Sequence, residues 1–204
     1  MTHLARKLTR EQKLARLTPA QRTVIERSQW LTEPWLADVV ADIAEVCGKR
    51  VLEPSCGDGE IVRACLDAGA QRVEAVELDK RLARNMARRF DAQGDRVRVS
   101  ISDFLEWRGQ GIDVATANTP YEDGADAAHL EHMLRFSPRA VVVMRLNALA
   151  GTERYKRLWS RFDARAVYVL PQRPDFGREA RRVGLKSTGA ESDFVVVDVL
   201  AREP

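Results

Sequence analysis

The chain has 204 residues, of which 45% are apolar and 31% charged, and its formal net charge is +3. This length suits one domain with a substantial core, and the composition is typical of a soluble globular protein. No apolar run approaches the roughly 20 residues of a membrane-spanning helix, and we recognise no secretory signal. Three cysteines without a CxxC pair argue against a disulfide framework or a zinc site and favour a reducing, cytoplasmic location.

Basic residues gather in two segments of the chain. Residues 1–28 hold seven Lys and Arg against two Glu, and the second segment, 173–186, is rich in arginine. Its basic members are Arg173, Arg178, Arg181, Arg182 and Lys186. Such clusters can neutralise phosphates and steer a polyanion, although solvated helix faces have the same composition.

The elements predicted in chain order begin with helices. Residues 2–17 indicate a basic amphipathic helix, Thr18-Pro19 begins a second helix to about Gln29, and a third runs from Pro34 to Val46. We therefore expect a basic helical N-terminal extension, residues 1–28, before a main domain, residues 29–204.

Strands and helices then alternate, which implies a parallel sheet with helices on both faces. The expected strands are 50–54, 72–78, 96–101, 113–118, 139–144, 164–170 and 193–200, and the expected helices are 59–68, 80–90, 125–135 and 152–162. The stretch 171–190 is too long for an ordinary connector, and such loops are functional or disordered.

The loop after the first of these strands, 53–59, contains two glycines and two acids. Glycines permit a tight turn and let a ligand lie against bare backbone, at the carboxyl end of a strand where ligands bind in such sheets. The three-glycine spacing of a phosphate-binding loop is missing, and Glu53 and Asp58 would repel a pyrophosphate. The loop instead suits a cation such as the sulfonium of S-adenosylmethionine.

An acidic residue also ends the second strand, and another follows the third. Glu77, followed by Leu78, is placed to accept hydrogen bonds from ribose hydroxyls. Asp103 can accept an adenine amino proton while the ring of Phe104 covers the base.

With these motifs in order, residues 29–200 resemble the S-adenosylmethionine-dependent methyltransferases of the Rossmann-like class. The resemblance implies a doubly wound α/β sheet of seven strands whose last strand runs antiparallel near the edge. It assigns Glu53, Pro54, Cys56, Gly57, Asp58 and Gly59 to the methionine side of the cofactor, Glu77 and Leu78 to the ribose, and Asp103 and Phe104 to the adenine.

The fourth strand ends in Asn118-Thr119-Pro120-Tyr121, beside the glycine loop in this topology. The tetrapeptide resembles the Asn-Pro-Pro-Tyr signature, which marks methyl transfer to planar exocyclic or amide nitrogens. The lone pair of such a nitrogen is delocalised, so two acceptors, the Asn118 side-chain oxygen and the Thr119 carbonyl, would stabilise the charge that develops on it. Pro120 stiffens the turn and Tyr121 stacks on the base. The signature requires no metal, and Asn118 also borders the cofactor.

Three further segments resemble adenine-specific methyltransferases. Thr32-Glu33-Pro34 is similar to a Thr-Pro-Pro motif that contacts the cofactor's methionine part, although Thr32 as a helix cap explains it equally simply. "LPQRPDFG" and "STGAESDF" loosely resemble loops of small phage-type enzymes. That likeness places Arg173, Lys186 and Ser187 on a loop near the target pocket. The basic segment 173–186 adds Arg178, Arg181 and Arg182 as expected nucleic-acid contacts.

The leading hypothesis is therefore methyl transfer to N6 of adenine in DNA, with low or partner-supplied sequence specificity. The alternatives are the same reaction on structured RNA, methylation of a protein glutamine amide, and a catalytically silent nucleic-acid-binding subunit. The basic segments argue against a protein glutamine substrate. A catalytically silent subunit would not need the intact set of site residues, which is Glu53, Glu77, Asp103, Asn118 and Tyr121. Helix 2–17 suits a homodimer arm equally well.

Overall fold

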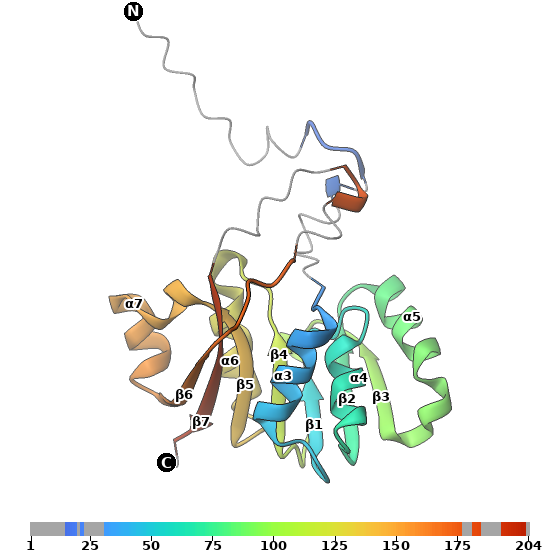
Figure 1. The fold of residues 1–204 in the computed structure, drawn as a ribbon, viewed down its shortest axis with the longest axis horizontal. Helices are drawn as coiled ribbons and strands as arrows, with labels where there is room; N and C mark the ends of the chain where they lie inside the picture. The colour runs from blue at the N-terminus through green and yellow to red at the C-terminus, as the bar shows by residue number, and fades with distance from the viewer. Residues whose placement is uncertain (1–14, 20, 23–30, 177–180, 185–192, 203–204) are drawn as a thin grey trace, which may run out of the picture.

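A computed structural model describes residues 15–19, 21–22, 31–176, 181–184 and 193–202. In this part of the chain, seven strands form one sheet in the order β3-β2-β1-β4-β5-β7-β6 (Figure 1). The strands are β1 (Arg50–Glu53), β2 (Arg72–Glu77), β3 (Val97–Ile101), β4 (Val114–Asn118), β5 (Arg139–Arg145), β6 (Phe162–Val169) and β7 (Phe194–Ala201). The α-helices are α3 (Pro34–Ala44), α4 (Glu60–Asp67), α5 (Lys80–Arg89), α6 (Ala125–Met133) and α7 (Thr152–Arg154).

The pairing of the strands confirms the predicted topology. β1 pairs in parallel with β2 and β4, and the parallel pairs β2–β3 and β4–β5 extend the sheet on either side. β7 lies antiparallel between β5 and β6. The chain order reverses between the neighbours β1 and β4, and a crevice for ligands opens at the carboxyl ends of the strands at such a point.

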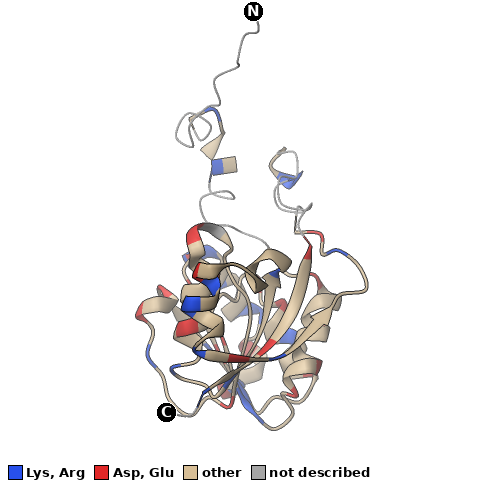
Figure 2. Ribbon diagram, turned by 90° about the vertical axis from the view of Figure 1, so that its left-hand side faces the viewer, with Lys and Arg blue, Asp and Glu red and all other residues tan. Residues whose placement is uncertain are grey.

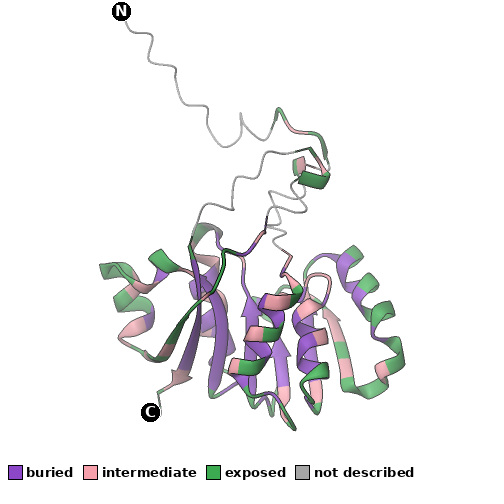
Figure 3. Cartoon of the chain, in the orientation of Figure 1, coloured by how far each residue is buried: buried purple, intermediate pink, exposed green. Residues whose placement is uncertain are grey.

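Two apolar cores cover the two faces of the sheet. On one face, Val51 and Val114 belong to a cluster with residues of α3, α4 and α5. Their chain neighbours Leu52 and Ala115 point the other way and pack with residues of α6. Figure 3 shows the buried central strands between the more exposed edge strands β3 and β6. Among the described helices, none has the length and apolar composition needed to cross a membrane.

Two helices end differently from the prediction. α3 stops at Ala44 because Glu45 adopts the left-handed conformation, with φ of 52°. The helix expected over 152–162 is a short α7 followed by a π-helical turn, Tyr155–Trp159. This wider turn buries Leu158 and lets Trp159 Nε1 donate to the Ala148 carbonyl at 3.1 Å.

The predicted helix start at Thr18 is confirmed. Thr18 Oγ1 accepts the Gln21 N–H at 3.3 Å, and Gln21 Oε1 accepts the Thr18 N–H at 2.9 Å, which is a capping box. Gln21 Nε2 also donates to the Val183 carbonyl at 2.9 Å. Both segments lie beyond the same edge of the sheet (Figure 1). Most of the extension 1–28 lies outside the described residues, so its boundary stays a prediction.

A buried ion cluster ties β5 and β7 to the end of α3. The Arg139 guanidinium donates to both carboxylate oxygens of Asp198, at 2.8 and 3.2 Å. It also contacts Glu45 at 2.8 Å and the carbonyls of Ile43 and Ala44 at 2.6 and 3.3 Å. Asp198 is fully buried, so Arg139 supplies most of its compensating charge.

We expect Arg139→Ala to lower the free energy of unfolding by about 3 kcal/mol or more, because it leaves the buried Asp198 carboxylate largely uncompensated. Urea denaturation measures the change. Glu45→Gln is the matched control and should have little effect, because the Glu45 side chain is mostly exposed. Equal losses in the two variants would contradict this role for the Asp198 pair.

Candidate functional site: a cavity at the carboxyl edge of the sheet

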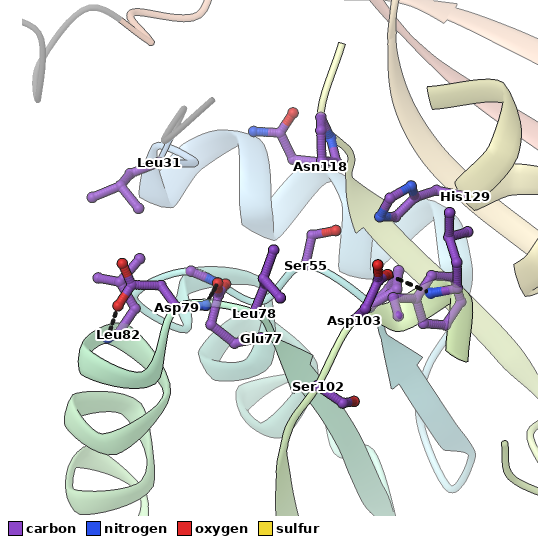
Figure 4. A pocket seen from close by; sticks show the side chains of 15 residues that line it. Leu31, Ser55, Glu77, Leu78, Asp79, Leu82, Ser102, Asp103, Asn118 and His129 are labelled. Atoms are coloured by element: carbon purple, nitrogen blue, oxygen red, sulfur yellow. Dashed lines mark hydrogen bonds between the residues drawn. The ribbon is translucent and has the colours of Figure 1, made fainter. Parts of the chain in front are cut away.

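A cavity of about 240 Å³ opens where β1, β2, β3 and β4 end. The loops after these strands supply most of its lining, as Figure 4 shows. The lining residues are Pro54, Ser55 and Gly57 after β1; Glu77 at the end of β2 and Leu78, Asp79 and Leu82 after it; Ser102, Asp103, Phe104 and Leu105 after β3; Asn118 at the end of β4 and Pro120 after it; and Leu31 and His129 from elsewhere.

The two glycines of the first loop have different tasks. Gly57 has a φ of 55°, and a Cβ there would lie 3.1 Å from Leu31 Cδ2 across the cavity. Gly57 therefore keeps space for a ligand. Gly59 has a φ of 89°, and a Cβ there would lie 2.7 Å from Phe90 Cε2 and 2.8 Å from Met86 Cγ. Gly59 therefore permits packing against α5 and does not line the cavity.

Glu77 joins the glycine loop to the second strand. Its Oε2 accepts the Gly57 N–H at 2.9 Å, and its Oε1 accepts the Asp79 N–H at 2.7 Å. Burial raises the pKa of Glu77 above its usual value, and these backbone hydrogen bonds oppose the rise. The carboxylate is thus held in one orientation at the cavity wall.

A second carboxyl group lies beneath the same loop. Glu53 is 1% exposed and accepts the Ser55 N–H at 3.0 Å. Burial, together with the neighbouring charge of Glu77, raises the pKa of Glu53 to about 8. A cation in the cavity would favour its ionised form, because opposite charges stabilise each other in a desolvated site. Burial also raises the pKa of the Cys56 thiol, which is therefore protonated and unreactive.

Asp103 and His129 lie at the other end of the cavity and point toward one another in Figure 4. Asp103 Oδ1 accepts the Leu105 N–H at 2.9 Å. His129 Nδ1 donates to the Ala125 carbonyl at 2.9 Å, and burial lowers its pKa, so the ring is neutral. The Phe104 ring is buried against His129, with the ring centroids 5.4 Å apart.

Two serines of the cavity lining carry hydroxyl groups that have no hydrogen-bond partner among the described residues. They are Ser55 Oγ and Ser102 Oγ, and both atoms are buried. Buried polar groups are almost always satisfied, so these hydroxyls indicate a polar ligand. Together with the carboxylates of Glu77 and Asp103, they fit a cation that carries hydroxyl and amino groups, such as S-adenosylmethionine. Pro54, Ser55 and Gly57 would hold its methionine part, and Glu77 and Asp103 its nucleoside.

Asn118 connects the cavity to the tetrapeptide. Its Nδ2 donates to Thr32 Oγ1 at 3.1 Å, and its Oδ1 accepts a hydrogen bond from the Tyr121 hydroxyl. The N-cap of α3 is Glu33, so Thr32 is not the helix cap. Thr32 instead orients the amide of Asn118.

Tyr121 is buried and lies outside the cavity lining. Its ring packs against Phe194 and Phe176, with centroids 5.2 and 6.2 Å away, and the Arg145 guanidinium lies 5.2 Å from its centroid. Burial raises the pKa of its hydroxyl well above the usual value, so that group stays protonated and donates to Asn118. Stacking of a base on Tyr121, as the sequence predicts, therefore requires these side chains to move.

Half of the predicted cofactor-binding and catalytic residues lie in the wall of the cavity. The predicted residues in the cavity wall are Pro54, Gly57, Glu77, Leu78, Asp103, Phe104, Asn118 and Pro120. Those outside the wall are Thr32, Pro34, Glu53, Cys56, Asp58, Gly59, Thr119 and Tyr121. Ser55 and Ser102 were missed although they adjoin predicted residues at strand ends. His129 was missed because no local motif on α6 marks it.

The predicted phosphate-binding residues are only partly described. Arg178, Lys186 and Ser187 lie outside the described residues. Arg173 pairs with Asp193 at 2.9 Å, Arg181 pairs with Asp175, and Arg182 follows in the same turn. These ion pairs are exposed, and a phosphate would have to compete with the carboxylates for the arginines.

Glu33, which stands where the similar Thr-Pro-Pro motif has a proline, anchors the segment that precedes the turn at Arg181. Its Oε2 accepts the Asp175 N–H at 2.7 Å and the Trp35 Nε1–H at 3.1 Å. The departure from the motif therefore gives the loop a fixed contact with α3.

The fold and this cavity define the class: the chain has the fold of S-adenosylmethionine-dependent methyltransferases, as the sequence predicts, and S-adenosylmethionine is the implied cofactor. A Pyrococcus horikoshii protein assigned as an RNA methyltransferase superposes with a TM-score of 0.73 at 18% identity, covering 94% of this chain and 96% of that one. No protein-family model matches the chain.

Three curated relatives are similar in sequence. A Methanospirillum hungatei protein assigned as ribosomal RNA small subunit methyltransferase A is 32% identical over 131 residues, which is 54% of this chain and 48% of that protein. The protein of that name from Thermosynechococcus vestitus is 32% identical over 155 residues, covering 72% of this chain and 56% of its own. The modification methylase CviBIII of Paramecium bursaria Chlorella virus NC1A is 33% identical over 75 residues, which is 36% of this chain and 19% of that protein. The chain thus spans about half the length of the two ribosomal RNA methyltransferases.

The raised pKa of Glu53 predicts a pH-dependent affinity for the cofactor. Below about pH 8 the empty site holds a proton on Glu53, and a bound cation expels it. The affinity for S-adenosylmethionine should therefore rise as the pH rises toward 8 and level off above it. Calorimetric titrations at several pH values measure the slope.

Glu53→Gln, which cannot ionise, should show a smaller slope. The amino group of the ligand titrates equally with both proteins, so the difference between their slopes isolates Glu53. Identical slopes in the two proteins would contradict the role of this carboxyl group.

Proposed function

We propose that this chain transfers a methyl group from S-adenosylmethionine to the exocyclic N6 of adenine in nucleic acid. The observation that carries the proposal is the position of Asn118, whose side chain borders the cofactor cavity while Thr32 holds its amide. An acceptor at this point can serve a nitrogen that approaches the cofactor from the tetrapeptide side.

When bound, the cofactor would supply a methyl group on a sulfonium, from which a neutral thioether leaves readily. Asn118 Oδ1 and the Thr119 carbonyl would accept hydrogen bonds from the two amino protons and stabilise the positive charge that develops on nitrogen as its bond to the methyl carbon forms and the carbon–sulfur bond breaks. One of the two protons then passes to solvent, which leaves a neutral methylamino group. Tyr121 now occupies Oδ1, so the entering amino group replaces the tyrosine hydroxyl there. The reaction requires no general base, because the methyl donor is already activated. It depends instead on the positioning of the two reactants, and a neutral His129 beside the cavity agrees with this.

The relatives support the choice of substrate, and the acidic residues of the cavity support a catalytic role. Two relatives are named as ribosomal RNA methyltransferases, which favours structured RNA over the DNA expected from the sequence. The viral modification methylase supports the DNA alternative. In RNA, unpaired bases can be splayed out and stacked on aromatic side chains, as a target next to Tyr121 would require. The carboxylates of Glu77 and Asp103, both in place at the cavity, count against a silent subunit.

The substrate assignment is tested with labelled S-adenosylmethionine and a panel of structured RNA, single-stranded RNA, duplex DNA and protein extract. We expect label in RNA, and nucleoside digestion should recover it as N6-methylated adenosine. Label in another base, or in protein alone, would refute the proposal. Label in DNA with none in RNA would leave the chemistry intact and correct the substrate.

Asn118→Ala should lower the rate of methyl transfer by about a hundredfold or more, because it removes one of the two acceptors in the transition state. Cofactor affinity, measured by calorimetry, should survive. Thr32→Val should lower kcat with little change in cofactor affinity, because it releases the Asn118 amide. Asn85→Ala, an exposed change on α5, is the control. Normal turnover by Asn118→Ala would exclude the assigned role.

A further inference from the structure

Arg145 is the last residue of β5 and lies next to the tetrapeptide. β5 pairs in parallel with β4, with Val143 opposite Asn118. Arg145 therefore extends two residues past the end of that pairing, beside the chain that carries Tyr121. Its guanidinium lies over the Tyr121 ring, 5.2 Å from the centroid.

This guanidinium has no carboxylate and no hydrogen-bond acceptor within the described part of the chain. The Arg145 side chain is only partly exposed, and its Nε is buried without a partner. Arginines elsewhere on β5 and around it pair with acids: Arg139 with Asp198, Arg154 with Asp126, and Arg173 with Asp193. On the face that carries β6 and α7, acidic and basic positions are intermingled along the ribbon (Figure 2). A partly desolvated, unpaired guanidinium is costly unless an anion binds it.

The position of Arg145 narrows the choice of anion. Arg145 does not line the cofactor cavity, so the carboxylate of the cofactor is not its partner. It stands over Tyr121, on the side of Asn118 from which the substrate would approach. A guanidinium fork matches the oxygens of a phosphate, which it can bind through two parallel hydrogen bonds.

We propose that Arg145 binds a phosphate group adjoining the target adenosine and so fixes its base beside Asn118. This inference rests on the proposed function, and it adds a substrate-binding residue that the sequence analysis did not select. The proposed role of Arg145 differs from that of Arg173 and Arg181, whose charges are already paired with acids.

The test uses a five-nucleotide RNA with one central adenosine, in three forms. One form has natural phosphates, and the other two carry a neutral methylphosphonate either before or after the adenosine. Binding is measured by fluorescence anisotropy with S-adenosylhomocysteine in excess, so that turnover plays no part. For the wild-type protein, neutralising one of the two phosphates should weaken binding about tenfold, the loss of a charged hydrogen bond.

Arg145→Ala should weaken binding of the natural RNA to the same degree and show no further loss with either neutral RNA. Arg145→Lys, which keeps the charge and loses the fork, should fall between the two. Arg98→Ala, an exposed change on the opposite edge strand β3, should bind all three RNAs as the wild type does. Cofactor affinity should be the same in every variant.

Two results would overturn the inference. One is an Arg145→Ala protein that still distinguishes natural from neutral RNA, and the other is a wild-type protein indifferent to both neutral phosphates. Either result with adenine methylation intact rejects the role of Arg145 alone. Phosphate-dependent binding without any methylation of adenine would instead reject the proposed function and leave the phosphate contact standing.

Discussion

The hydrogen bond between Asn118 and Thr32 is the constraint on which the rest of the site depends. An amide presents one donor end and one acceptor end, so binding of Nδ2 to Thr32 decides where Oδ1 points. That oxygen now accepts the Tyr121 hydroxyl, on the edge of a cavity built from four strand ends. Without this bond, the amide could turn either end toward an incoming group.

The topology explains why these groups meet. β1 and β4 are neighbours although β2 and β3 lie between them in the chain, so their loops open a crevice at one edge of the sheet. The antiparallel β7 then brings Phe194 opposite Arg145, next to Tyr121. At the other end of β5, the buried pair Arg139–Asp198 holds β7 in this position. Core stability and the geometry of the site thus share one strand pair.

Charge is divided between two neighbouring regions. Carboxyl groups, Glu53 and Glu77, surround the loop that would hold a cationic cofactor, and burial keeps their pKa values raised. Arg145 stands on the tetrapeptide side, where a polyanionic substrate would arrive. The sequence predicts that Arg173 and Arg181 also contact the substrate. In the structure both are paired with acids, and these ion pairs stabilise their own segments. The pairing of each arginine therefore distinguishes a structural role from a ligand-binding one.

The sequence by itself determined the alternating elements, the sheet class, the Thr18 cap and the strand-end residues Glu77, Asp103 and Asn118. These follow from local periodicity and from the rule that parallel strands end at a common edge. Only the tertiary structure decided the π-helical turn at Tyr155–Trp159, the unpartnered hydroxyls of the cavity and the contribution of His129. The bond from Asn118 to Thr32, 86 residues apart, and the Arg145 contact with Tyr121 belong to the same group. Their cause is packing between distant segments, which no pattern of neighbouring residues encodes.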